Sequence, residues 1–399
     1  MSRVMIAWEL GVGYGHASTF VALGRLLQER GCEVVVALRD PDGDGAMLHR
    51  AGLRCVAAPV WNRYRGVATR SHSYAAMLAK VGFLDTQHLP GVIDRWRALF
   101  QRFAPDLLIA NHAPTALFAS SGSNLKRVLY GTGFECPPRL DPFPPIDPNR
   151  DFSAERLLET EQRVLDCVNQ VCNRSGFTPK QSVSDILAAD AEFLCTFAEL
   201  DPYRAHRDAV EYWGPQVDSR PTLLSRWRAS VKRGAIFAYL RRDYARLSEA
   251  MAALQACGRE VLVHCPGLPR KYVDQYTTRK LTFIAKPLDS GQMVSRFELV
   301  VSHAGHGTCL ALLLEGRAHL MLPTNLEQEM NARAVAGEGA GRFVERENDA
   351  APIEDALNAM LASDLETRAA RVFARRYAGF SAPGQTRGIA GRIQRLLQD

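Results

Sequence analysis

Residues 299–308 read LVVSHAGHGT, a short apolar run that passes directly into histidine, glycine and threonine. The apolar run predicts a buried strand, and the glycines after it predict a tight loop at the start of a helix. The same pattern occurs near the N-terminus, where RVMIAW at residues 3–8 is followed by a glycine loop that ends in His16. Strand, loop and helix in this order are typical of a parallel sheet covered by helices.

Both halves of the chain repeat this alternation. The first half has predicted strands at residues 3–8, 33–38, 106–110, 127–130 and 193–197, with helices at 19–30 and 151–173. The second half has predicted strands at 235–239, 260–264, 281–284, 299–302 and 319–322, with helices at 244–256, 308–315 and 328–336. Proline predicts a loop over 137–148, and the tail at 353–397 is helical with a break at 381–384.

Residues 214–234 separate the two halves, since they contain Gly-Pro and Arg-Pro pairs and no clear period. We therefore predict an α/β fold of two Rossmann-like, doubly wound domains, residues 1–214 and 215–380. Two such domains in tandem form a cleft where the carboxyl ends of their sheets face each other.

The composition is that of an ordinary soluble protein, with 47% hydrophobic and 23% charged residues among 399. No apolar run is long enough to span a membrane, and the N-terminus lacks the features of a signal peptide. The net charge of +6 is scattered rather than clustered, so we expect no nucleic-acid partner. Peripheral contact with an anionic membrane surface stays open, and the sequence does not specify an oligomeric state.

Nine cysteines are spread along the chain, and no two have Cys-x-x-Cys spacing. An odd number without paired spacing predicts reduced, mostly buried thiols in a cytoplasmic protein rather than a disulfide framework or a zinc site.

The N-terminal loop has glycine at positions 11, 13 and 15, followed by His16. Alternate glycines let the backbone approach a ligand closely, and the amides of the next helix suit an anion such as a diphosphate. The positive helix end favours neutral imidazole, which is the form that a general base requires. Two other readings stay open: a dinucleotide loop with Asp40 on the ribose, or glycines needed for turn geometry alone.

The C-terminal loop combines His303, Gly305 and His306 with the pair Gly307-Thr308. Amides at the following helix N-terminus are ready for phosphate oxygens, His303 adds a side-chain donor, and Thr308 can cap the helix. His306 lies between the glycines and is a candidate donor contact. Glu327 and Gln328 follow the next strand and suit sugar hydroxyls.

With these residues the chain resembles the GT-B glycosyltransferases related to UDP-glucuronosyltransferases, plant secondary-metabolite glucosyltransferases and bacterial antibiotic glycosyltransferases. The matching signature is His303, Gly305, Gly307-Thr308, Gly316, Pro323, Glu327-Gln328 and Asn331-Ala332. The family's N-terminal Gly-x-Gly-His matches Gly13 to His16. The GT-B arrangement also implies that a C-terminal helix at 381–399 packs back toward the N-terminal domain.

The resemblance implies an inverting transfer of a sugar from a UDP or dTDP donor to a hydroxyl-bearing natural product or glycolipid precursor. His16 would be the base, and Gly13 would lie near the donor. His303 and the amides at Gly307 and Thr308 would bind the diphosphate, while Glu327 and Gln328 would hold the sugar. The positive helix end would stabilise the leaving group, so neither a metal nor another cofactor is expected.

The chain departs from the family pattern at the acid that often supports the catalytic histidine. Asn111 stands there, and it can orient an imidazole but cannot offset its charge. The next residue, His112, either contacts the acceptor or is structural. The family's glycine-serine loop is replaced by Leu240-Arg241-Arg242. Either Arg241 or Arg242 contacts the donor diphosphate, or the two arginines are only the solvated start of a helix.

Two further sequence features bear on the site. Phe134 and the glycines before it are expected to shape the acceptor pocket. The Asp42-Gly43-Asp44 turn resembles a metal motif, but a glycine- and aspartate-rich turn needs such residues anyway, so no metal site is predicted. Two other functions stay open. One is an NAD-type oxidoreductase that uses residues 11–15 with Asp40. The other is an inactive nucleotide-sugar-binding partner, suggested by Asn111 and by Ala311, which stands where the plant members of the family have a ribose-binding glutamate.

Overall fold

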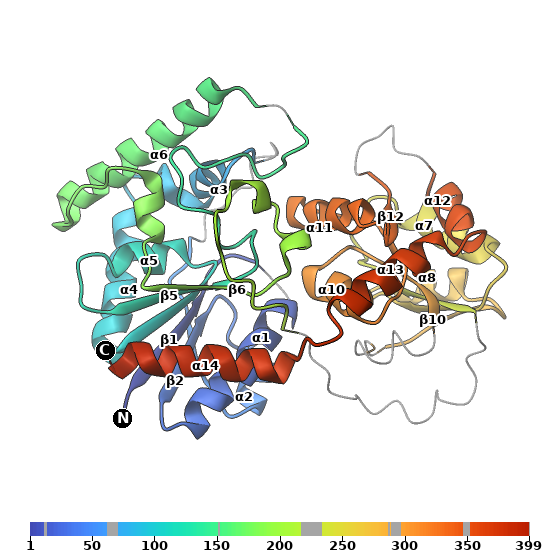
Figure 1. Ribbon diagram of the computed structural model, residues 1–399, viewed down its shortest axis with the longest axis horizontal. Helices are drawn as coiled ribbons and strands as arrows, with labels where there is room; N and C mark the ends of the chain where they lie inside the picture. The colour runs from blue at the N-terminus through green and yellow to red at the C-terminus, as the bar shows by residue number, and fades with distance from the viewer. Residues whose placement is uncertain are drawn as a thin grey trace. The chain divides into compact units, whose positions relative to one another are not determined.

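The computed structural model describes residues 1–11, 14–61, 71–150, 152–216, 234–285, 288, 297–345 and 352–398, without the side chains of residues 14–16 and 18. The chain divides into two compact units (Figure 1). Unit 1 comprises Met1–Gln216 with Ser381–Asp399, and unit 2 comprises Val217–Phe380.

Unit 1 contains a six-stranded parallel sheet in the order β3-β2-β1-β4-β5-β6. Its strands are β1 (Arg3–Trp8), β2 (Glu33–Leu38), β3 (Arg54–Ala57), β4 (Leu107–Asn111), β5 (Lys126–Gly131) and β6 (Ala191–Leu194). Residues 4–8 of β1 and 107–110 of β4 are all apolar because helices cover both faces of a parallel sheet. The register pairs Trp8 with Asn111, so β1 and β4 end side by side.

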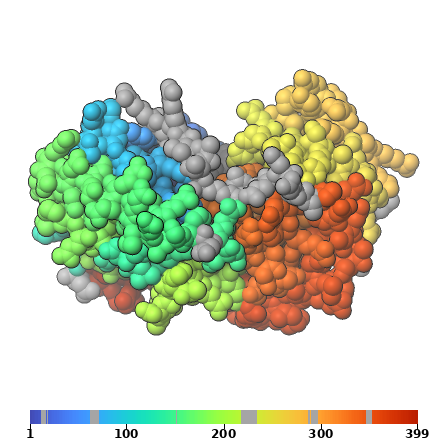
Figure 2. All heavy atoms as spheres, turned by 90° about the horizontal axis from the view of Figure 1, so that it is seen from above, coloured from blue at the N-terminus to red at the C-terminus, as the bar shows by residue number. Residues whose placement is uncertain are grey.

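Helices form a separate core on each face of this sheet. They are α1 (Tyr14–Glu29), α2 (Ala46–Arg50), α3 (Tyr74–Leu78), α4 (Leu89–Phe103), α5 (Pro114–Ala119), α6 (Ala154–Ser175) and α14 (Ala382–Gln398). One core contains buried valines from one side of α6. The other side of α6 is on the surface of unit 1, in the green region of Figure 2. The other core joins α1 to α14 (Figure 1).

The C-terminal helix α14 is therefore part of unit 1, although the chain reaches it through unit 2. Ile389 and Ile393 are fully buried in the core that contains Phe20 and Leu23 of α1. The Arg30 guanidinium also donates to Oε1 of Gln394 at 3.0 Å. The apolar face of α14 is thus a structural component of the first sheet's covering layer.

Unit 2 repeats the same topology with the strand order β12-β11-β10-β7-β8-β9. Its strands are β7 (Ala235–Tyr239), β8 (Val261–His264), β9 (Leu281–Phe283), β10 (Phe297–Ser302), β11 (His319–Met321) and β12 (Gly341–Phe343). Its helices are α7 (Leu247–Ala256), α8 (Arg270–Tyr276), α10 (His306–Leu314), α11 (Leu326–Gly337), α12 (Ile353–Leu361) and α13 (Leu365–Arg376). Counted within each unit, both sheets have the Rossmann order 3-2-1-4-5-6.

The predicted α/β class with two doubly wound, Rossmann-like sheets is confirmed. The first helix begins at Tyr14 rather than at residue 19, and the strand predicted at 193–197 ends at Leu194 because the chain turns into a 3-10 helix at Ala198–Leu200. Two short edge strands, β3 and β12, were not predicted, since their mixed composition lacks a buried apolar run.

The tail breaks twice, at residues 362–364 and again before Ala382. Pro383 lies in the first turn of α14, where proline fits a helix. Of the predicted boundary, residues 217–233 lie outside the described part of the chain. The predicted cleft concerns the placement of the two units and stays a prediction.

All nine cysteines lie in the described ranges and are free, seven of them buried, which agrees with the expectation of reduced thiols. Among the described helices, none combines the length and the apolar character that crossing a membrane requires.

We predict that Ile393→Ala lowers the free energy of unfolding of unit 1 by about 2–4 kcal/mol, because it leaves a cavity under a fully buried side chain. Denaturant unfolding followed by tryptophan fluorescence measures the change. The neighbouring exposed Arg392→Ala serves as the control and should change it by less than about 0.5 kcal/mol. Equal stabilities of the two variants would contradict the packing of α14 on α1.

Candidate active site

In unit 2 the strand order reverses between β10 and β7, and the loops after both strands meet at His303. The buried ring lies with Nδ1 2.6 Å from the Leu322 carbonyl, so Nδ1 carries the proton. Nε2 then accepts the Arg241 amide at 2.8 Å. Burial lowers the pKa of His303, which favours this neutral form. One imidazole thereby joins the ends of β7, β10 and β11.

Ala304 follows with φ of +57°, a left-handed conformation that costs a non-glycine residue about 1–2 kcal/mol. Two buried side chains hold it. Ser302 Oγ accepts the Ala304 amide at 3.2 Å, and Asn331 Nδ2 donates to the Ala304 carbonyl at 3.1 Å. Ser302 is oriented in turn by His319 Nε2 at 2.8 Å, and burial lowers the His319 pKa to about 3, so this ring stays neutral.

This network ends at the N-terminus of α10, whose N-cap is Gly305. The amides of Gly307 and Thr308 lie in the first turn, where a helix supplies no acceptor. A Cβ at Gly305 or Gly307 would meet no atom within 4 Å, so the space beside the backbone is open. A positive helix end with open approach is an anion site by its geometry.

One detail of the sequence interpretation needs correction. Thr308 does not cap α10, because the helix begins two residues earlier, at His306. His306 itself is the first residue of the helix and half-buried.

Glu327 and Gln328 lie in the first turn of α11 rather than at a strand end. The Gln328 amide donates to Asn325 Oδ1, and Gln328 Oε1 accepts from both the amide and the hydroxyl of Thr324 at 2.8 Å. The Gln328 carboxamide oxygen is thus engaged in the turn, which leaves its NH₂ group for a ligand. Glu327 is half-buried beside it.

Arg241 reaches the same loop through its backbone, while its guanidinium forms two hydrogen bonds with the Asp243 carboxylate, at 2.7 and 2.9 Å. These bonds lower the pKa of Asp243 to about 2. The pair is largely exposed, so an anionic ligand competes with Asp243 for the guanidinium at small cost.

In unit 1 the strand order reverses between β1 and β4, and Asn111 and His112 follow at the end of β4. Asn111 is 3% exposed, and its Nδ2 donates to the Tyr130 carbonyl at 2.7 Å and to Glu135 Oε2 at 3.3 Å. His112 is left-handed, with φ of +45°, and its carbonyl accepts the Leu10 amide at 3.1 Å. The structure brings the His112 ring beside Phe134, edge to face at 6.3 Å.

Glu9 is a buried acid at this edge that the sequence reasoning missed. It follows β1 and is 3% exposed, and its carboxylate accepts from the hydroxyl and amide of Thr115 and from the Ala116 amide. Burial raises the Glu9 pKa from 4.5 to about 7, although these hydrogen bonds oppose the shift. A carboxylate directly after an apolar strand was the available signal.

The backbone of His16 lies in the first turn of α1. Its side chain, and Gly13 before it, lie outside what the structure describes. The roles predicted for these two residues therefore stay predictions.

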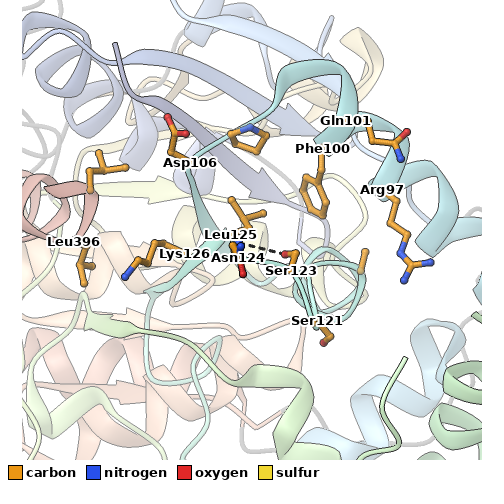
Figure 3. Close-up of a pocket in the computed structure, with 14 residues that line it drawn as sticks. Arg97, Phe100, Gln101, Asp106, Ser121, Ser123, Asn124, Leu125, Lys126 and Leu396 are labelled. Carbon is orange, nitrogen blue, oxygen red and sulfur yellow. Dashed lines mark hydrogen bonds between the residues drawn. The ribbon is translucent and has the colours of Figure 1, made fainter. Parts of the chain in front are cut away.

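A pocket of about 780 Å³ lies elsewhere in unit 1. Figure 3 shows its lining side chains, which come from α4, from the segment between α5 and β5, and from the end of α14. Asp106 and Lys126 place it at the amino ends of β4 and β5, the sheet edge opposite Asn111. It shares no residue with the loops described above.

Within the described ranges, no group of three or more His, Cys, Asp or Glu side chains is placed to hold a metal ion. The Asp42–Asp44 segment belongs to a turn in which Asp40 Oδ1 accepts the Gly43 amide at 2.8 Å. The Asp40 side chain that could have bound a ribose is thus part of this turn.

Comparison with known proteins decides the enzyme class. Residues 265–378 match the family model described as the glycosyltransferase family 28 C-terminal domain. The chain is 25% identical over 365 residues to the zeaxanthin glucosyltransferase of Pseudescherichia vulneris, a match that covers 84% of each. The protein is a GT-B glycosyltransferase.

Solved structures agree with this fold. The spinosyn rhamnosyltransferase SpnG, complexed with thymidine diphosphate, has a TM-score of 0.69 at 17% identity, covering 99% of this chain and 100% of that one. The glycosyltransferase VinC in complex with DTDP has a TM-score of 0.72 at 16% identity, covering 98% and 99%. The oxidoreductase alternative is therefore set aside.

Glu9 makes the stability of the glycosyltransferase depend on pH. Its pKa is higher in the folded state, so its contribution to stability is present below pH 4.5 and lost as the pH rises through about 7. We expect wild type to lose about 2–3 kcal/mol more unfolding free energy than Glu9→Gln between pH 5 and pH 8. Denaturant unfolding at both pH values measures this, with exposed Glu33→Gln as a control that behaves like wild type.

Asn331→Ala tests the support of the donor loop. It leaves the buried Ala304 carbonyl without its donor and releases the left-handed residue before α10. We expect the affinity for dTDP or UDP to fall about tenfold, by titration calorimetry. The exposed Asn358→Ala is the matched control in the same unit. Unchanged affinity in Asn331→Ala would show that the loop does not need this contact.

Proposed function

We propose that this glycosyltransferase transfers a sugar from a dTDP or UDP donor to a hydroxyl of an apolar acceptor, with inversion and with His16 as general base. The open N-terminus of α10 at the reversal of the second sheet is the observation that carries the proposal. Thymidine diphosphate in complexes of two structural neighbours supports a nucleoside diphosphate donor.

In this proposal the diphosphate oxygens accept from the amides of Gly307 and Thr308, and Arg241 adds a guanidinium. The Gln328 NH₂ group and the Glu327 carboxylate bind sugar hydroxyls. The helix end stabilises the negative charge of the leaving diphosphate, so the step requires no metal. A direct N–H contact from His303 to the diphosphate requires that Nε2 both gain a proton and release the Arg241 amide, so His303 chiefly positions this loop.

The chemical step moves one proton and exchanges one bond. His16 takes the proton of the acceptor hydroxyl, the acceptor oxygen bonds to the anomeric carbon, and the bond from that carbon to the diphosphate oxygen breaks. Attack from the face opposite the leaving group inverts the anomeric configuration. Asn111 Oδ1, which finds no hydrogen-bond partner among the described residues, is an acceptor suited to an imidazole N–H at this edge.

The partly buried rings of His112 and Phe134 lie near the end of β4, backed by the buried Tyr74, and suit an apolar acceptor. Related proteins support this acceptor class, since one is a zeaxanthin glucosyltransferase and a neighbour binds the spinosyn aglycone.

His16→Ala should lower transfer about 10²- to 10⁴-fold while changing the affinity for dTDP or UDP less than twofold. Transfer from dTDP-glucose and UDP-glucose to hydroxylated carotenoids and macrolide aglycones, without added metal, supplies the rate, and NMR of the product supplies the anomeric configuration. Retained configuration, or wild-type rates in His16→Ala, would refute the mechanism.

A further inference from the structure

The amide of Asn111 has a fixed orientation. Its Nδ2 points at two acceptors, the Tyr130 carbonyl and Glu135 Oε2, and a carboxamide turned the other way would set oxygen against oxygen. Oδ1 is consequently the side of the amide that is left without a partner among the described residues. A buried acceptor in this state is able to take one further hydrogen bond from a neighbouring group.

Two groups fix this orientation: the Tyr130 carbonyl and, in the loop after the same strand, the Glu135 carboxylate. After β5 the chain turns tightly, with the Glu135 and Cys136 amides donating to the Thr132 carbonyl at 3.1 and 3.0 Å. The turn folds Glu135 back, so that Oε2 also accepts the Thr132 amide at 2.8 Å. Glu135 is 4% exposed and Asn111 is 3% exposed, so the contact between them is buried.

The end of β5 leaves room for the contact between Asn111 and Glu135. A Cβ at Gly131 would collide with Glu135 Oε2 and come within 3.2 Å of Asn111 Nδ2. Glycine therefore stands where any side chain would separate the amide from the carboxylate. The glycine turn that the sequence assigned to the acceptor pocket thus also serves the Asn111 contact.

We propose that Glu135 is a positioning residue of the transfer reaction: it helps to fix the Asn111 amide so that Oδ1 stays available to the imidazole of the base, and it supplies the negative charge that asparagine lacks. This proposal rests on the proposed role of His16. An aspartate at position 111 would supply charge and acceptor in one group. Here the two functions are divided between Asn111, which accepts, and Glu135, which carries the charge behind it. Polarisation of the amide by the carboxylate strengthens the outer hydrogen bond.

One other titratable group near Glu135 changes its charge in the range of the pH measurement. Tyr74 on α3, Tyr130 on β5, Cys136 and Cys195 all have pKa values raised, first by burial and also by the charge of Glu135, and they stay neutral between pH 6 and pH 9. Burial raises the pKa of Glu9 to about 7, so the pH profiles are compared in a Glu9→Gln background, where the base dominates kcat/KM.

The test compares Glu135→Gln with wild type. Glutamine keeps an oxygen for Asn111 and Thr132 but removes the charge. We expect kcat to fall about tenfold with KM for dTDP-glucose unchanged, and the acidic limb of the kcat/KM profile to move about one pH unit lower. Glu161→Gln, a buried glutamate of α6 outside the site, should keep the wild-type profile.

A second pair of variants moves the carboxylate from position 135 to position 111 and makes the test specific to this contact. Asn111→Asp alone sets two carboxylates against each other and should lower kcat more than tenfold. In the double variant Asn111→Asp/Glu135→Gln the two carboxylates no longer repel each other, so activity should recover above that of Asn111→Asp, although the Tyr130 carbonyl loses its donor. Should Glu135→Gln fail to fold, the double variant still tests the role of charge, because it returns the pair to a single carboxylate.

An unshifted profile in Glu135→Gln, or a double variant no more active than Asn111→Asp, would overturn the role of Glu135. Either result together with an inactive His16→Ala would leave the proposed function intact. An active His16→Ala would instead refute the proposed function, and this proposal with it.

Discussion

Each sheet reverses its strand order once, between β1 and β4 in unit 1 and between β10 and β7 in unit 2. Connections from the two strands at a reversal leave in opposite directions, so no crossing segment covers their carboxyl ends. The loops there are consequently open to a ligand. Because no segment covers them, hydrogen bonds between their own side chains and backbone must fix their conformation. Asn111, Arg241 and His303 lie at one of these two reversals, while Phe134 and the pair Glu327-Gln328 follow the next strand outward.

The two reversals differ in electrostatics. In unit 2 the supporting groups are neutral: His303 and His319 are both buried with lowered pKa values, and the amides of α10 face outward. Because His303 and His319 are neutral, they do not offset the positive partial charge at the N-terminus of α10, and this charge attracts an anion. In unit 1 two buried carboxylates, Glu9 and Glu135, lie behind the strand ends. A carboxylate that is ionised at this edge favours a group that gains a proton during a reaction.

Both loops also contain a left-handed residue that is not glycine, His112 after β4 and Ala304 after β10. Such conformations persist where surrounding contacts determine them, and they cluster at functional sites. Ala304 is held by Ser302 and Asn331, and His112 by its carbonyl contact with Leu10. Hydrogen bonds to neighbouring elements thus stabilise the two left-handed residues. The conformation of each loop therefore depends on residues that are distant in sequence.

The sequence by itself determined the repeated strand–loop–helix pattern, the apolar strands and the glycine loop at residues 303–307, because these follow from local periodicity and backbone freedom. It also identified Asn111 as a departure from the family pattern. Only the tertiary structure decided which groups support Asn111 and Ala304. Glu135 is 24 positions from Asn111, and Asn331 is 27 from Ala304, so no local pattern joins them. They meet because parallel strands bring the ends of separate segments to one edge of a sheet.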